Sequence, residues 1–239
     1  MRTLGIDLAS SDKKTGVCQL RWSGGRVTVD HLEVAADDDT LVDLASRSDA
    51  VGIDAPFGWP SSFTGFVTGQ VSAGQWTTQL RDELRFRRTD MRVRERTGGW
   101  PLSVSSDRIA LAAMRCALLL ARLEVMDRSG DGRVFETYPA AALNVWGLTS
   151  RGYKGRKGAQ KRSALVAELA RAAPWLDLSE AHRLRCAEND DALDALVGAL
   201  LARAAARGLT ERPPDEHLAD ARREGWIHIP VGGLDELHS

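Results

Sequence analysis

The sequence predicts an α/β domain with a mixed five-stranded sheet, three antiparallel strands followed by two crossover strands, flanked by helices. Three short segments rich in β-favouring residues open the chain, at residues 2–9, 16–22 and 26–34. Two more follow at 51–54 and 133–137, each after a stretch with helical periodicity. Consecutive short strands pair as an antiparallel meander, whereas strands separated by a helix lie parallel. The two kinds of spacing together predict the mixed sheet.

The turns and helix ends of this arrangement are also visible in the sequence. Ser23, Gly24 and Gly25 join the second and third strands and are typical of a tight hairpin turn. Apolar periodicity and capping residues indicate the helices; the last one, for example, follows Asn189 and ends before Gly208. Helices are expected at residues 37–48, 107–127, 140–146, 163–173 and 189–207, and a late edge strand at 226–229.

One long segment, residues 56–106, differs in composition from the rest of the chain. It is rich in glycine, proline and aromatic residues, and one helix is predicted within it, at about residues 77–86. Connections of this length in compact domains are usually functional or mobile. A lid over a site and a homodimer surface are both open interpretations. We otherwise expect a single domain over residues 1–239, with a loosely ordered tail at 230–239.

Composition limits the classes of function. The 239 residues are 43% hydrophobic and 27% charged, which is ordinary for a globular protein. A net charge of −1 excludes a global basic field, so any attraction for nucleic acid must come from local patches. No signal peptide is visible and no apolar run reaches the roughly 20 residues of a membrane helix. Cys18, Cys116 and Cys186 form no CxxC pair, and we expect reduced core thiols in a cytoplasmic protein.

Acidic residues stand at the ends of three predicted strands. Asp7 and Asp54 each close a Gly-Ile-Asp triplet, and Glu136 ends the fifth strand. Ligand sites of α/β sheets gather at such strand ends. A single aspartate of this kind is as well explained by a turn or cap, but the repeated triplet favours a shared site.

The last predicted helix adds two further acids, Asp191 and Asp194. Asp191 is in the first turn, where a carboxylate also suits the helix dipole. Asp194 is one turn further and lies at the edge of the apolar stripe that faces the sheet. An unpaired charge there would be unfavourable unless a cation or a basic side chain compensates it. We therefore expect Asp194 to bind a metal.

These residue types indicate which metal the site would prefer. Clustered carboxylates without histidine or cysteine ligands suit Mg²⁺ or Mn²⁺, and the five histidines show no zinc-binding spacing. A two-metal site can activate water and stabilise the leaving oxygen of a phosphodiester. The expected metal ligands are Asp7, Asp54, Asp191 and Asp194, with Glu136 as an additional ligand or base.

Two locally basic segments are candidates for holding a phosphate-rich substrate. Residues 151–162 carry six basic residues and no acid, and residues 81–96 carry seven arginines against four acids. Such runs bind phosphate in some proteins and are merely solvated in others. The expected substrate contacts are Arg88, Asp90, Tyr153, Lys154 and Arg156. Tyr153 could stack on a base, and Arg88 with Asp90 could instead form a structural ion pair.

Six short motifs carry a resemblance to a known family. They are Gly5-Ile6-Asp7, Gly52-Ile53-Asp54-Ala55-Pro56, Arg88-Thr89-Asp90, Glu136-Thr137-Tyr138-Pro139, Tyr153-Lys154 and Asp190-Asp191-Ala192-Leu193-Asp194-Ala195. In this order they resemble the family known as domain of unknown function 429, predicted nucleases with an RNase H-like fold. That resemblance implies an RNase H-like domain and a metal-dependent nuclease acting on DNA or RNA.

The resemblance has departures, and other functions remain open. RuvC resolvases, in the wider superfamily, follow their first aspartate with Pro-Gly, whereas Leu8 and Ala9 stand here, so a Holliday-junction role is not implied. Asp12, Thr15 and Gly16 faintly resemble the phosphate-binding turn of the actin and sugar-kinase type, which would imply a nucleotide-binding phosphotransferase or ATPase. A non-catalytic binding protein of the same fold is the third alternative.

Overall fold

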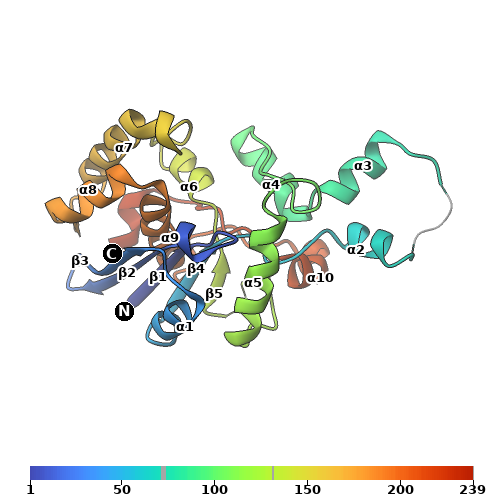
Figure 1. Cartoon of the computed structure of the whole chain (residues 1–239), viewed down its shortest axis with the longest axis horizontal. Helices are drawn as coiled ribbons and strands as arrows, with labels where there is room; N and C mark the ends of the chain where they lie inside the picture. Colours follow the sequence, from blue (N-terminus) through green and yellow to red (C-terminus); the bar gives the residue numbers. More distant parts are fainter. Residues whose placement is uncertain (71–73, 131, 239) are drawn as a thin grey trace.

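Six strands form one mixed sheet in the computed structural model, which describes residues 1–70, 74–130 and 132–238 (Figure 1). The strands are β1 (Arg2–Asp7), β2 (Gly16–Ser23), β3 (Arg26–Val34), β4 (Ala50–Asp54), β5 (Val134–Glu136) and β6 (Leu176–Asp177). Their order across the sheet is β5-β4-β1-β2-β3-β6. β1, β2 and β3 pair antiparallel, whereas β4 pairs parallel with both β1 and β5, and β6 lies parallel to β3.

The predicted mixed sheet is therefore confirmed, but the expected count of five strands is wrong. The additional strand, β6, has only two residues, Leu176 and Asp177, which is too short to produce a period-two pattern. The expected edge strand at 226–229 is also absent from the described residues. Ile227 instead makes a single bridge to Glu136 at the free side of β5.

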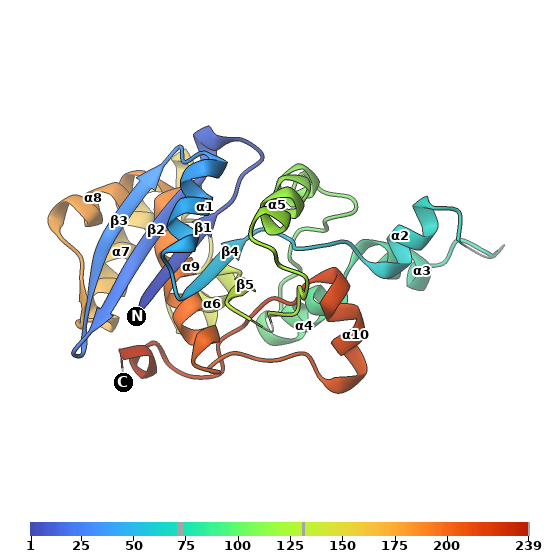
Figure 2. The same cartoon turned by 90° about the horizontal axis from the view of Figure 1, so that it is seen from below.

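Helices cover both faces of the sheet (Figures 1 and 2). One face carries α6 (Pro139–Val145), α7 (Ala159–Ala172), α8 (Glu180–Glu188) and α9 (Asp190–Ala206). The other face carries α1 (Asp38–Ser46) and α5 (Ala110–Arg122). The remaining elements are α2 (Ser61–Val67), α3 (Thr78–Arg85), α4 (Arg88–Thr97), α10 (Asp215–Glu224) and three short 3-10 turns, η1 (Asp12–Lys14), η2 (Arg156–Gly158) and η3 (Leu234–His238).

Outside the 56–106 segment, two of these helices, α8 and α10, are absent from the sequence prediction. Most of their side chains are polar or charged, and within α8 only Cys186 is buried. In α10 only Ala221 and Glu224 are buried. A polar helix of this kind has no wide apolar stripe, which is the signal that sequence periodicity detects. α9 shows the opposite case, because 13 of its residues are buried and its predicted cap, Asn189, accepts a hydrogen bond from Ala192 N at 3.1 Å.

The strand pattern divides the core into two layers. Leu4 and Ile6 of β1 pack with α1 and α5, whereas Gly5 lies against α9 on the other face. A Cβ atom on Gly5 would lie 2.0 Å from Ala195 O, and one on Gly52 would lie 2.6 Å from Gly198 O. Only glycine therefore permits the backbone of α9 to approach β1 and β4 this closely.

The segment 56–106 contains three helices instead of the single one predicted. α2 and α3 project away from the sheet beyond α10, and α4 lies beside α10 (Figures 1 and 2). α2 has no buried residue, and α3 buries only Leu84. Neither helix therefore contributes much to a buried core, and α2 is held to α10 by the hydrogen bond from Ser61 N to Glu224 Oε1 at 2.7 Å.

The C-terminal tail is packed, which corrects the expectation of loose order. Leu234 and Leu237 in η3 are buried in the same core cluster as α9, with exposures of 5% and 1%. Arg203 Nε also donates a hydrogen bond to Leu237 O at 3.2 Å. The three cysteines are buried and unpaired, as expected. Among the described residues, no helix has both the length and the apolar character needed to cross a membrane.

Candidate metal site

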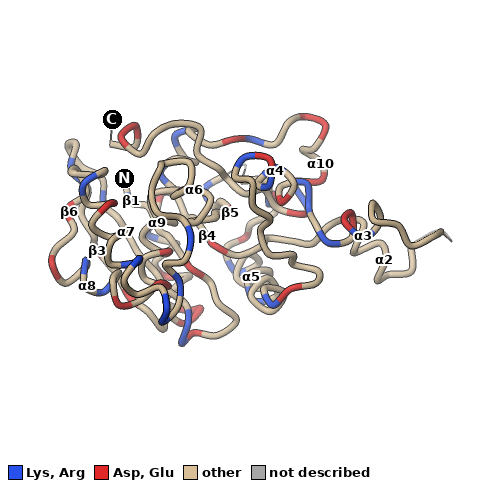
Figure 3. Tube along the Cα trace, turned by 90° about the horizontal axis from the view of Figure 1, so that it is seen from above, with Lys and Arg blue, Asp and Glu red and all other residues tan. Residues whose placement is uncertain are grey.

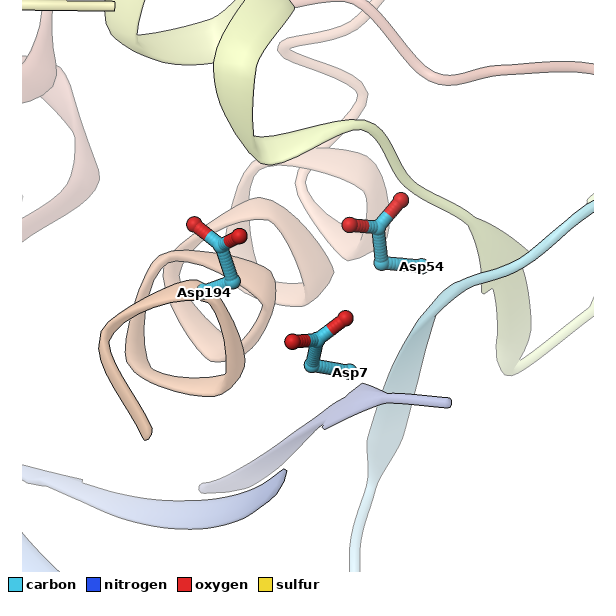
Figure 4. A group of neighbouring side chains, drawn as sticks. All are labelled: Asp7, Asp54 and Asp194. Atoms are coloured by element: carbon cyan, nitrogen blue, oxygen red, sulfur yellow. The ribbon is translucent and has the colours of Figure 1, made fainter. Parts of the chain in front are cut away.

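Three carboxylates from separate parts of the chain converge at one edge of the sheet. Asp7 ends β1, Asp54 ends β4 and Asp194 is in the second turn of α9. Each offers an oxygen atom that lies within 4.8 Å of the others, and the side chains point toward one another (Figure 4). Oxygen ligands at this spacing suit a hard divalent cation such as Mg²⁺ or Mn²⁺.

The repeated Gly-Ile-Asp triplet explains this convergence. β1 and β4 are parallel neighbours in register, so Gly5 faces Gly52 and Asp7 faces Asp54. Side chains two residues apart lie on the same face of a strand. Both aspartates therefore lie on the face where the glycines admit α9, and the close helix backbone brings Asp194 to them.

Burial and the repulsion of neighbouring carboxylates disfavour the ionised forms of Asp7 and Asp54. Burial raises the pKa of Asp7 well above its usual value, and the charges of Asp194 and Asp54 raise it further. Burial also raises the pKa of Asp54 to about 7, although Lys154 opposes this shift. A bound cation would relieve this repulsion, which is why the donor set fits a metal.

Two residues of the loop before α7 contact Asp194. Tyr153 donates its hydroxyl to Asp194 Oδ1 at 2.7 Å. Lys154 Nζ lies 2.6 Å from Asp194 Oδ2. Burial tends to lower the pKa of Lys154, but the charges of Asp194 and Asp54 raise it well above its usual value. The ammonium group is therefore a side-chain cation beside the carboxylates, as the burial of Asp194 requires.

These contacts correct one predicted role and support another. The ring of Tyr153 is 1% exposed and belongs to the hydrophobic core, so it is not available to stack on a base. Lys154 has a side chain that is 51% exposed and lines the cavity above the carboxylates. Lys154 is therefore accessible from the cavity, and its contact with a substrate phosphate stays a prediction.

Arg162, counted in the basic run 151–162, has a structural role instead. Its guanidinium is buried and donates hydrogen bonds to four backbone carbonyls, those of Tyr153, Gly155, Ala187 and Glu188. These bonds tie the loop that carries Tyr153 and Lys154 to the end of α8. The position of Lys154 beside Asp194 thus depends on an arginine that does not touch the site.

Glu136 lines the same cavity, but its carboxylate belongs to a buried ion-pair network. Arg87 Nη2 lies 2.8 Å from Glu136 Oε1, and Arg87 Nη1 donates to Glu136 Oε2 at 2.9 Å. Phe57 N donates to the same Oε2 at 3.1 Å. Glu136 is not among the three grouped carboxylates. Its role as an additional ligand or base stays a prediction.

The ion pair expected between Arg88 and Asp90 forms with the neighbouring arginine instead. Arg87, 2% exposed, holds Asp90 through Nη2 at 2.9 Å and Nε at 3.2 Å. Arg88 points elsewhere, with Nε 3.5 Å from Asp220 Oδ2, and it does not line the cavity. The helix start explains the difference, because Arg87 is the N-cap of α4 and its backbone N donates to Asp90 Oδ2 at 2.9 Å, which holds Asp90 beside the Arg87 side chain.

Arg156 and Asp191 are the remaining predicted site residues. Arg156 is exposed in η2 and does not line the cavity. Asp191 is half-buried and close enough for its charge to raise the pKa of Asp7, but it is outside the group of three carboxylates. The structure therefore brings together three of the four predicted metal ligands.

Asp7 and Asp54 line a cavity of about 640 Å³, whereas the buried Asp194 is not among its lining residues. Its walls come from the turn after β1, the segment before α5, the start of α6 and the loop at 150–154. Two exposed arginines, Arg108 and Arg151, line it and make no hydrogen bond or ion pair to any residue that the structure describes. Elsewhere on the chain, acidic and basic residues are interspersed (Figure 3).

Arg115 of α5 holds the turn after β1 in place through hydrogen bonds. Its guanidinium donates to Ala9 O at 2.9 Å, to Thr15 Oγ1 at 2.8 Å and to Asp12 Oδ1 at 2.6 Å. Both side chains of the Asp12–Thr15 motif are thus engaged within the protein. Like Arg87 and Arg162, Arg115 is not identified by the sequence, since nothing in the local pattern distinguishes a buried arginine from a solvated one.

Comparison with known proteins identifies the family but not the activity. Residues 5–219 match the model of a family described as protein of unknown function, DUF429. No curated protein and no solved structure gives a significant match. The matched range includes both Gly-Ile-Asp strands, the 56–106 segment and the Asp194 helix. This chain belongs to the DUF429 family.

Proposed function

We propose that the protein is a metal-dependent nuclease with an RNase H-like fold that hydrolyses phosphodiester bonds of nucleic acid. The convergence of Asp7, Asp54 and Asp194 carries this proposal. The sheet supports it, because its order β3-β2-β1-β4-β5 places the antiparallel meander and the two crossover strands as expected for that fold. The cavity adds three cationic side chains suited to phosphate, those of Lys154, Arg108 and Arg151.

In this proposal, residues of the candidate metal site and of the adjacent loop have separate roles. Asp7, Asp54 and Asp194 would hold Mg²⁺ or Mn²⁺, which when bound activates water and stabilises the charge on a leaving oxygen. A second ion of a two-metal site would need Asp191 or substrate phosphates as further ligands. Lys154 would move its ammonium group from Asp194 to a phosphate oxygen as the cation takes over the carboxylate. Tyr153 would keep Asp194 oriented through its hydroxyl.

Calorimetric titration with Mn²⁺ tests the site directly. We expect binding by the wild type and loss of binding in the double variant Asp7→Asn, Asp194→Asn. The double variant Asp30→Asn, Asp177→Asn removes the same charge far from the cavity and should bind as the wild type does. Absence of wild-type binding, both alone and with an oligonucleotide that could complete the metal shell, would refute the metal site.

Activity is tested with Mn²⁺ on single strands, duplexes and branched substrates, with ATP as a parallel substrate. Cleavage that disappears in Asp7→Asn supports the nuclease. Metal-dependent ATP turnover without cleavage would favour the phosphotransferase or ATPase alternative. Metal binding without turnover of either substrate would favour the binding-protein alternative.

A further inference from the structure

The shape of the cavity limits which nucleic acid could reach the carboxylates. Its volume of about 640 Å³ is in the range of sites that enclose a single small ligand. Asp7 and Asp54 are only partly exposed, and Asp194 is 1% exposed. A phosphodiester must therefore enter the cavity to approach them. Enzymes that bring a nucleotide into a pocket act on single strands or extrude the nucleotide from the duplex.

The wall formed by the segment before α5 and its first turn is apolar. Pro101, Leu102, Ile109 and Ala112 line it, and Leu102 is 58% exposed although it is a large aliphatic side chain. The face of an unstacked base is an apolar surface that such a wall can cover. A paired base within a duplex keeps its faces stacked on neighbouring bases and offers none to the wall.

Charged and polar groups of the cavity complement the backbone of such a strand. Arg108 adjoins the apolar wall and Arg151 belongs to the separate 150–154 loop, and neither has an acidic partner among the described residues. Thr137 also lines the cavity, and its buried Oγ1 has no hydrogen-bond partner within the described chain. Phosphate and sugar oxygens would satisfy these donors.

We infer that the substrate is single-stranded, with the nucleotide at the scissile bond inserted into the cavity. Its base packs against Leu102, Ile109 and Ala112, and Arg108 and Arg151 bind phosphates on either side of the bond. This inference rests on the proposed nuclease function for the identity of the ligand. The two are tested separately, because binding is measured without metal and cleavage with it.

Fluorescence anisotropy in EDTA with labelled 15-mers of DNA and of RNA measures the preference. We expect a single strand to bind at least tenfold more tightly than the blunt duplex of the same sequence. The double variant Arg108→Gln, Arg151→Gln should weaken single-strand binding about tenfold. Arg171→Gln, Arg185→Gln is the matched control, because these arginines are exposed on α7 and α8, lack ion pairs among the described residues and do not line the cavity.

Two more variants separate a cavity effect from a charge effect. Ala112→Trp should fill the apolar wall and weaken single-strand binding while Mn²⁺ binding and melting temperature stay unchanged. Thr137→Val, which keeps the shape of the side chain, should weaken single-strand binding by a smaller factor than Ala112→Trp does. Equal affinity for the single strand and the duplex would overturn the inference. An equal loss of single-strand affinity in the two double arginine variants would also overturn it.

Cleavage with Mn²⁺ distinguishes failure of the inference from failure of the nuclease proposal. Cleavage of duplex as fast as of single strand would overturn the single-strand assignment and leave the nuclease standing. A single-strand preference in EDTA with no cleavage of DNA or RNA would refute the nuclease and still support insertion of an unpaired nucleotide.

Discussion

Lys154 Nζ lies 2.6 Å from Asp194 Oδ2, so a side-chain cation already neutralises the most buried carboxylate of the candidate metal site. A bound metal ion and this ammonium group would then compete for the same charge. The ion pair would stabilise the metal-free protein and would lower its affinity for a metal ion. The contribution of Lys154 to stability and to metal binding can therefore be measured.

Lys154→Met should destabilise the metal-free protein by about 1–2 kcal/mol, between the values for exposed and buried ion pairs. For a chain of this size that corresponds to a fall of roughly 2–8 °C in melting temperature. Mn²⁺ should then raise the melting temperature more in the variant than in the wild type. Lys157→Met is the control, since Lys157 is exposed in η2 and has no ion pair among the described residues. Identical Mn²⁺ shifts in wild type and Lys154→Met would contradict the competition.

Two neighbouring arginines at the start of α4, Arg87 and Arg88, should differ sharply in their contribution to stability. Arg87→Met leaves Asp90 and Glu136 buried without their cationic partner, and loss of one member of a buried ion pair destabilises by about 3–5 kcal/mol. Arg88→Met removes only an exposed contact and should change stability by less than about 1 kcal/mol. Urea unfolding measures both. Adding Glu136→Gln to Arg87→Met should restore part of the loss, and similar losses in the two single variants would refute the assignment.

His228 should make the protein less stable in acid. Its ring is 5% exposed; Nδ1 lies 2.8 Å from Thr210 Oγ1, and Nε2 lies 3.1 Å from Ser129 O. Burial lowers its pKa to about 4, with Arg212 adding to the effect and the Ser129 contact opposing it. Between pH 6.5 and 4 the unfolded chain therefore binds a proton that the folded chain does not, so stability falls as the pH falls.

Urea unfolding at pH 7.5 and pH 5.0 tests this histidine. The penalty at pH 5.0 should be about 2 kcal/mol, given one pKa unit as roughly 1.4 kcal/mol. His228→Asn should lose correspondingly less stability between the two pH values than the wild type does. His217→Asn is the control, because its ring makes no hydrogen bond within the described residues. The same pH dependence in wild type and His228→Asn would exclude the histidine as its source.

Gly5→Ala should damage both stability and the metal site. The added Cβ would lie 2.0 Å from Ala195 O and 2.2 Å from Ala199 N, so α9 would have to move away from β1. Overpacking of this kind destabilises by about 1–3 kcal/mol, and by more where only backbone can yield. Mn²⁺ affinity should also fall, because the shift carries Asp194 away from Asp7. Gly132→Ala, with no atom within 4 Å of the added Cβ, should change neither quantity.

Strand ends and helix starts were predictable because their signals are local. The short apolar runs of β1 and β4, the repeated Gly-Ile-Asp triplet and the cap at Asn189 depend only on a few consecutive residues. They were sufficient to anticipate that Asp7, Asp54 and Asp194 would meet. The polar helices α8 and α10 and the two-residue β6 carry no such signal, and they were missed.

The mixed sheet, the family and the three acids of the candidate site could all be inferred from the order of the residues. The surroundings of these acids became known only from the folded chain. In the folded chain Arg87, and not Arg88, forms ion pairs with Asp90 and Glu136, and the ring of Tyr153 is buried. Arg162 and Arg115 each hydrogen-bond to a loop of the site. This is because the partner of a charged side chain depends on where a helix begins and on contacts between residues more than a hundred positions apart, which no local pattern records.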